Sequence, residues 1–145
     1  MLAIEKIGCF IFLGWMSLFD IKSRRLPVLY IAFGFMSALA VRIIFNNVPL
    51  RPYITASVIG IIFILISGFS KEKIGYGDSF MILITGMLLG IENLMFVLFS
   101  AFIMCFVTGI VIMYIRKSIR NMSLPFVPFL FAAFILLMGL QKWAS

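Results

Sequence analysis

The sequence contains no histidine and few charged residues. Asp, Glu, Lys and Arg make up 12% of its 145 residues, against about a quarter in soluble domains. The lack of histidine excludes Ser/His and Cys/His catalysis and the usual zinc sites. The two cysteines, Cys9 and Cys105, stand alone in apolar runs, and the lack of a CxxC pair excludes a zinc knuckle or a redox pair of that kind.

Apolar residues dominate the chain, at 64% of the total, and such a chain cannot cover itself with polar surface. We therefore expect it to face lipid, where each apolar run must be helical to satisfy its own backbone. The sequence predicts a single all-α polytopic domain over residues 1–145, with about six transmembrane helices. The six predicted spans are Ile7–Phe19, Val28–Phe45, Tyr53–Phe69, Ser79–Ile91, Leu94–Ile115 and Leu124–Leu140.

The 12 basic residues predict how the chain is oriented. They are scattered between apolar runs instead of forming a stripe, so nucleic acid is not an expected partner despite the net charge of +7. Eight of them fall on the first, third and fifth connections, and this richer side is predicted to be cytoplasmic, with both termini outside. These eight are Lys22, Arg24, Arg25, Lys71, Lys73, Arg116, Lys117 and Arg120.

Asp20 and Asp78 are the only aspartates, and the predicted spans place both on the cytoplasmic side. Two carboxylates held close together cannot both ionise cheaply. One of them then keeps a proton, and the other can act as general base on a water molecule between them. The alternative interpretations are structural: Asp20 could pair with Arg24, and Asp78 could cap a helix.

The residues around the two aspartates suit this chemistry. Gly75 and Gly77 precede Asp78 in a GxGD pattern and would let the backbone and an extended peptide approach the carboxylate. Arg24 and Lys73 are candidates for tuning the pKa of the nearby carboxylates. The plainer interpretation is anchoring at the membrane surface for Arg24 and a solvated loop for Lys73. We expect no metal or other cofactor, because an aspartate pair needs none and no cluster of ligands is visible.

Three segments resemble motifs of the type IV prepilin peptidase family, in the order and spacing of that family. The three segments are Asp20 followed by Arg24-Arg25-Leu26-Pro27, the GxGD run Gly75-Tyr76-Gly77-Asp78, and Leu124-Pro125-Phe126-Val127-Pro128-Phe129-Leu130. The resemblance implies a membrane aspartic peptidase of about six spans that removes the basic leader of prepilins and pseudopilins. It implies Asp20 and Asp78 as the catalytic pair, Gly75 and Gly77 as motif glycines, and the cytoplasmic membrane of a prokaryote as the location.

The chain also departs from the family pattern. It lacks the cysteine-containing insert that the longer members carry, so we expect no methyltransferase activity. Val28, Ile74, Ser79 and Phe80 stand where many members have other residues, which affects the expected substrate preference more than the chemistry.

Two other functions remain open. One is an intramembrane protease of the presenilin or signal-peptide-peptidase type, which shares GxGD but has a different late motif. The other is a non-catalytic small transporter or assembly subunit, although its spans would be expected to carry more polar residues. The sequence does not predict which pilin is cleaved or whether the chain forms oligomers.

Overall fold

The computed structural model describes residues 3–23, 27–44, 49–69, 75–116 and 124–143. These residues are all-α, as the sequence predicts. The helices are α1 (Ala3–Ser23), α2 (Val28–Ile44), α3 (Arg51–Phe69), α4 (Tyr76–Arg116) and α5 (Val127–Trp143).

The expectation of six spanning helices is not supported. The described residues form five helices, because the predicted fourth and fifth spans lie within α4. Two of these helices, α3 and α4, are long and apolar enough to cross a membrane. The predicted boundary at Glu92 and Asn93 falls inside the helical residues of α4, so the polar pair does not end a helix.

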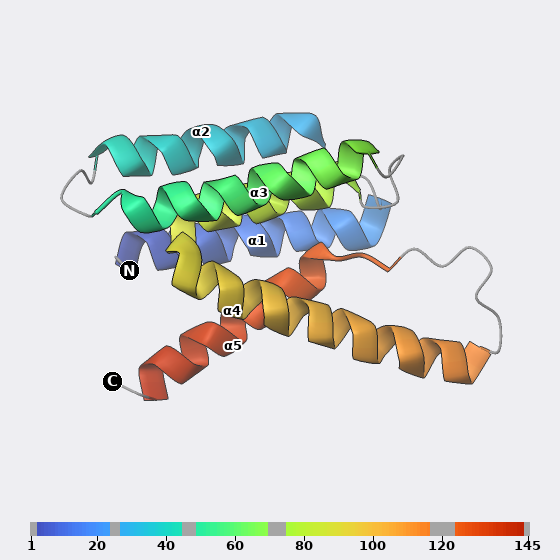
Figure 1. Cartoon of the computed structure of the whole chain (residues 1–145). Coiled ribbons are helices and arrows are strands. Elements are labelled where there is room, and N and C mark those ends of the chain that lie inside the picture. Colours follow the sequence, from blue (N-terminus) through green and yellow to red (C-terminus); the bar gives the residue numbers. More distant parts are fainter. Residues whose placement is uncertain (1–2, 24–26, 45–48, 70–74, 117–123, 144–145) are drawn as a thin grey trace.

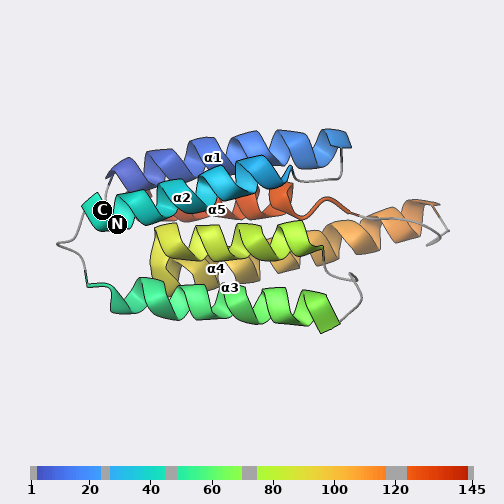
Figure 2. The same cartoon turned by 90° about the horizontal axis from the view of Figure 1, so that it is seen from above.

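Gly90 interrupts α4. Its backbone is non-helical, with φ 75° and ψ 171°. Figures 1 and 2 show that the part of α4 before Gly90 runs back alongside α3, and that the part after Gly90 turns and runs in the opposite direction. Asn93 supports the turn, since its side-chain amide donates to the Leu89 carbonyl at 3.0 Å. The Asn93 amide oxygen accepts from Gln141 of α5 at 3.0 Å, which fastens the turn to the end of that helix.

The first half of α4 is the centre of the bundle. Every residue from Met81 to Gly90 is buried, and all of them except Thr85 are apolar, as expected of a helix that is covered on every side. It packs most closely against α3, where a Cβ on Gly60 would lie 2.5 Å from the Leu83 Cα atom. The two helix backbones therefore approach at a point where no larger residue fits.

One end of the bundle brings together segments that are far apart in the sequence. Figure 1 places the end of α1, the end of α3, the start of α4 and the start of α5 at this end. The start of α1, the Gly90 turn and the end of α5 lie at the opposite end. Asp20 and Asp78 belong to the first of these two ends, so helix connectivity alone gathers the two aspartates.

Candidate active site

Asp20 is buried at the N-terminus of another helix. It lies on α1, one turn before the end of that helix at Ser23, and is 6% exposed. Its Oδ2 atom accepts a hydrogen bond of 3.1 Å from the backbone N–H of Val127, the first residue of α5. The first N–H groups of a helix have no partner within the helix, and the helix N-terminus favours negative charge. The carboxylate of α1 thus accepts one of the N–H groups that the first turn of α5 leaves without a partner.

Two opposing effects act on the pKa of Asp20, a residue that lies just outside the first predicted span. Burial removes water from the carboxylate, and this desolvation raises the pKa of Asp20 above its ordinary value. The hydrogen bond from Val127 acts in the opposite direction and lowers the pKa, because it favours the charged form. Burial is the larger effect.

Asp78 lies in the first turn of α4 and does not cap it. The carbonyl of Gly75 accepts the N–H of Ser79 at 3.2 Å, so Gly75 holds the capping position and Asp78 is the third helical residue. The interpretation of Asp78 as a helix cap is therefore wrong. Asp78 is half-buried, and Asp20 is close enough for its charge to act on the Asp78 carboxyl.

The two motif glycines lie beside Asp78. A Cβ on Gly75 would lie 3.2 Å from the Oδ2 atom of Asp78, so the glycine keeps this side of the carboxylate clear. Gly77 is half-buried within the first turn of α4. Arg24 and Lys73, the two cations predicted to tune the pair, lie outside the described residues.

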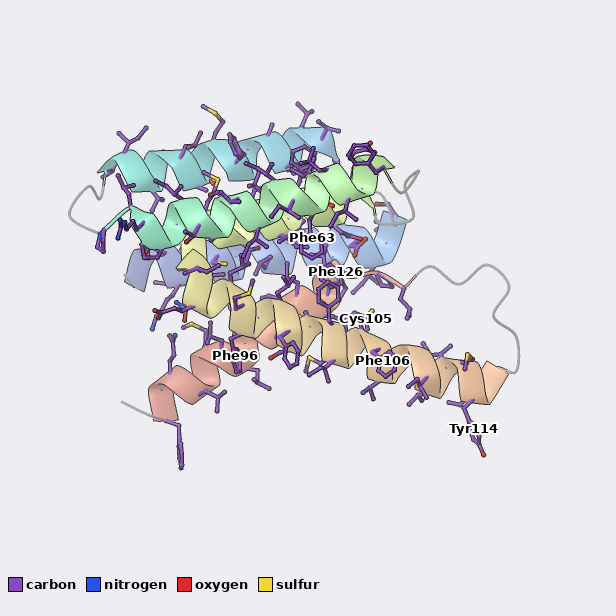
Figure 3. All side chains as sticks on the ribbon, viewed as in Figure 1. Phe63, Phe96, Cys105, Phe106, Tyr114 and Phe126 are labelled. Carbon is purple, nitrogen blue, oxygen red and sulfur yellow. The ribbon has the colours of Figure 1, made fainter. Side chains whose placement is uncertain are left out.

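Ser79 fastens the Asp78 turn to α3. Its buried hydroxyl donates to the carbonyl of Phe63 at 3.2 Å, across the α3–α4 contact. The Phe63 ring stacks on Phe102 of α4, with centroids 6.1 Å apart, and Phe102 contacts Phe126, just before α5, at 5.3 Å. We call these three rings the phenylalanine ladder. The ladder joins α3, which binds Ser79 next to Asp78, to the start of α5, which binds Asp20. Figure 3 shows Phe126 at the start of α5 with Phe63 near it, whereas Tyr114 lies far away along α4.

Sequence reasoning missed three residues at this site. Val127 stood inside the late motif but had no assigned role, and Ser79 was noted only as a departure from a family pattern. Cys105 lies within electrostatic range of Asp78, although the sequence places it in an apolar run far from either aspartate. In the part of the chain that the structure describes, no three His, Cys, Asp or Glu side chains are grouped so as to hold a metal ion.

The comparisons with known proteins identify the family. A sequence model of the type IV leader peptidase family matches residues 7–110, which include Asp20, the GxGD run and Asp78. The late motif at residues 124–130 lies beyond the matched region. No match was found among curated proteins or among solved structures. Because the match covers more than half of the sequence, the chain belongs to the type IV leader peptidase family.

Proposed function

We propose that this membrane peptidase is an aspartic endopeptidase whose catalytic pair is Asp20 and Asp78. One observation carries the proposal. The only two aspartates of the chain, on helices separated by two others, are brought within electrostatic range at one end of the bundle. Buried or half-buried carboxylates so placed are costly to a fold, and such groups cluster at functional sites.

The pair can hydrolyse a peptide bond without help from another group. The ionised carboxylate takes a proton from water as the resulting hydroxide attacks the substrate carbonyl carbon. The protonated carboxyl donates a hydrogen bond to the carbonyl oxygen and then supplies a proton to the leaving amine. The first carboxyl ends the cycle protonated and the second ionised, so a proton exchange restores the starting state.

The proposed substrate is the basic leader of a prepilin-like or pseudopilin membrane protein. The family supports a leader peptidase, and the unhindered side of Asp78 at Gly75 gives an extended peptide a route to the carboxylates. We place the aspartate end of the bundle at the cytoplasmic face of a prokaryotic membrane, because eight of the 12 basic residues belong to the connections on that side. Both termini are then outside.

The test is to map the cut in a pilin-like precursor with a basic leader, a glycine and an apolar helix. The precursor is co-expressed with the chain in membranes, and its products are compared by mass spectrometry with those from membranes that lack the chain. We expect one new N-terminus, between the leader and the apolar helix. A cut inside the apolar helix would support the presenilin-like alternative instead, and an uncut precursor would contradict the proposed substrate.

A further inference from the structure

We propose that Val127 is a positioning residue. Through its backbone N–H, the first turn of α5 holds Asp20 as the ionised general base and leaves the proton on Asp78. This inference rests on the proposed catalytic pair and adds to it an assignment of roles. It also gives the late Pro-Phe-x-Pro segment a function, since Val127 is the variable residue of that segment, directly before its second proline.

The two carboxylates differ in the hydrogen bonds that they accept. Asp20 accepts a backbone hydrogen bond of 3.1 Å at a helix N-terminus, in a buried setting. Within the described ranges, the Asp78 carboxyl accepts no comparable hydrogen bond, although it lies in the first turn of α4. A donor fixed in the backbone favours the charged form of its acceptor. When the two groups share one proton, that proton therefore resides on Asp78.

The N–H of Val127 is held rigidly. Val127 is fully buried, and the carbonyl of Phe126 accepts the N–H groups of Phe129 and Leu130 at 3.0 and 3.1 Å. Pro128, the second residue of α5, has a fixed φ and no N–H. Val127 therefore supplies the only amide proton of the first two residues of the helix. The phenylalanine ladder holds the Phe126 ring against Phe102. The donor that Asp20 meets thus belongs to the backbone, so no donor side chain has to be ordered.

The described residues place few ionisable side chains at the end of the bundle that holds Asp20. In the portion described, the ionisable side chains at this end are Asp78, Tyr76 and Cys105 on α4, Tyr30 on α2 and Lys22 on α1. The first turn of α5 contains none. Lys22 is exposed, and Tyr30 contacts the ring of Phe19. The backbone N–H of Val127 is therefore the group through which α5 acts on the pair.

The experiment removes this N–H and measures the pH dependence of kcat/KM, with a synthetic precursor that carries a basic leader as substrate. Val127→Pro deletes the proton at a first helical position, where proline is well tolerated. A second variant replaces residue 127 by the corresponding α-hydroxy acid in cell-free translation, so that an ester oxygen stands in place of the N–H. The two variants share only the lost donor, and the ester decides the matter if the proline variant does not accumulate.

Arg51→Pro is the matched control. Arg51 is the first residue of α3 and is followed by Pro52, just as Val127 is followed by Pro128, but it lies at the opposite end of the bundle. A second control, Val127→Ala, changes the side chain and retains the N–H. Both controls are expected to keep the two limbs of the pH profile in place, whatever their rates.

Losing the hydrogen bond raises the pKa of Asp20, so activity should be lost at a higher pH as the solution is acidified. We expect the acid limb of both test variants to move up by about one to two pH units, with the alkaline limb unchanged. Unchanged limbs with a lower rate would show a merely structural contact, and movement of the alkaline limb alone would reverse the roles; either result overturns the inference. If the wild type cleaves, these failures concern Val127 alone, whereas a wild type without activity would overturn the proposed function as well.

Discussion

At the scale of single residues, the site depends on backbone groups as much as on side chains. Asp20 accepts a hydrogen bond from the N–H of Val127, and the hydroxyl of Ser79 donates to the carbonyl of Phe63. The carbonyl of Gly75 accepts the N–H of Ser79 in the first turn of α4. Backbone partners belong to the helices themselves, so they lose no side-chain freedom when the contact forms. Among the described residues, backbone groups of the helices hold the Asp20 carboxylate and the helix turn that carries Asp78.

Gly90 is the residue on which the path of α4 depends. Its φ of 75° and ψ of 171° lie in a region that only glycine adopts easily, and a Cβ would also lie 3.3 Å from the Tyr53 ring. We predict that Gly90→Ala lowers the free energy of unfolding by about 1–3 kcal/mol. The measurement is denaturation of the purified protein in detergent.

Gly139→Ala is the control for this prediction, because Gly139 is helical and a Cβ there meets nothing within 4 Å. Its stability should stay within about 1 kcal/mol of the wild type. Equal stability of the two variants would show that the turn at Gly90 carries no backbone strain for alanine.

At the scale of elements, the contact between α3 and the first half of α4 positions Asp78. Gly60 permits this contact, because any side chain there would meet the Leu83 backbone at 2.5 Å. A backbone cannot move aside as a flexible side chain can. We predict that Gly60→Ala forces the helices apart, costs about 1–3 kcal/mol in unfolding free energy and reduces peptidase activity.

The control is Gly8→Ala on α1, where a Cβ meets nothing within 4 Å. Detergent denaturation and leader cleavage are measured on both variants. If Gly60→Ala kept wild-type stability and activity, close packing of α3 on α4 would not be what holds Asp78 in place.

The sequence predicted the elements better than their ends. All six predicted apolar runs overlap helices, because apolar length is a strong signal in a chain with 12% charged residues. Four runs match one helix each with small shifts at their ends, and the other two lie together in α4. The break in α4 was expected at Glu92 and Asn93, the polar pair, and the structure has it at Gly90. Polarity misled the prediction here: Asn93 bonds the Leu89 carbonyl beside the turn, and the backbone freedom of glycine makes the turn.

At the scale of the whole molecule, the sequence predicted that Asp20 and Asp78 lie on one side of the helices, but not which group holds Asp20 there. The aspartates, the GxGD glycines and the order of the motifs can be read from residue types. The contact between Asp20 and Val127 joins residues 107 positions apart, and it involves a backbone N–H that is the same in every non-proline residue. The residue type does not indicate which backbone N–H will serve as such a donor, so the donor can be identified only from the fold.

The measurement that tests the central claim most directly is leader cleavage by Asp20→Asn and Asp78→Asn. Asparagine keeps the shape of the side chain but can neither accept the proton of water nor cycle its own. We predict that each change lowers the cleavage rate by at least about a hundredfold, while the protein still accumulates in the membrane. Glu92→Gln removes an exposed carboxylate from the same helix as Asp78 and should cleave as the wild type does. Normal cleavage by either aspartate variant would contradict the two-aspartate account.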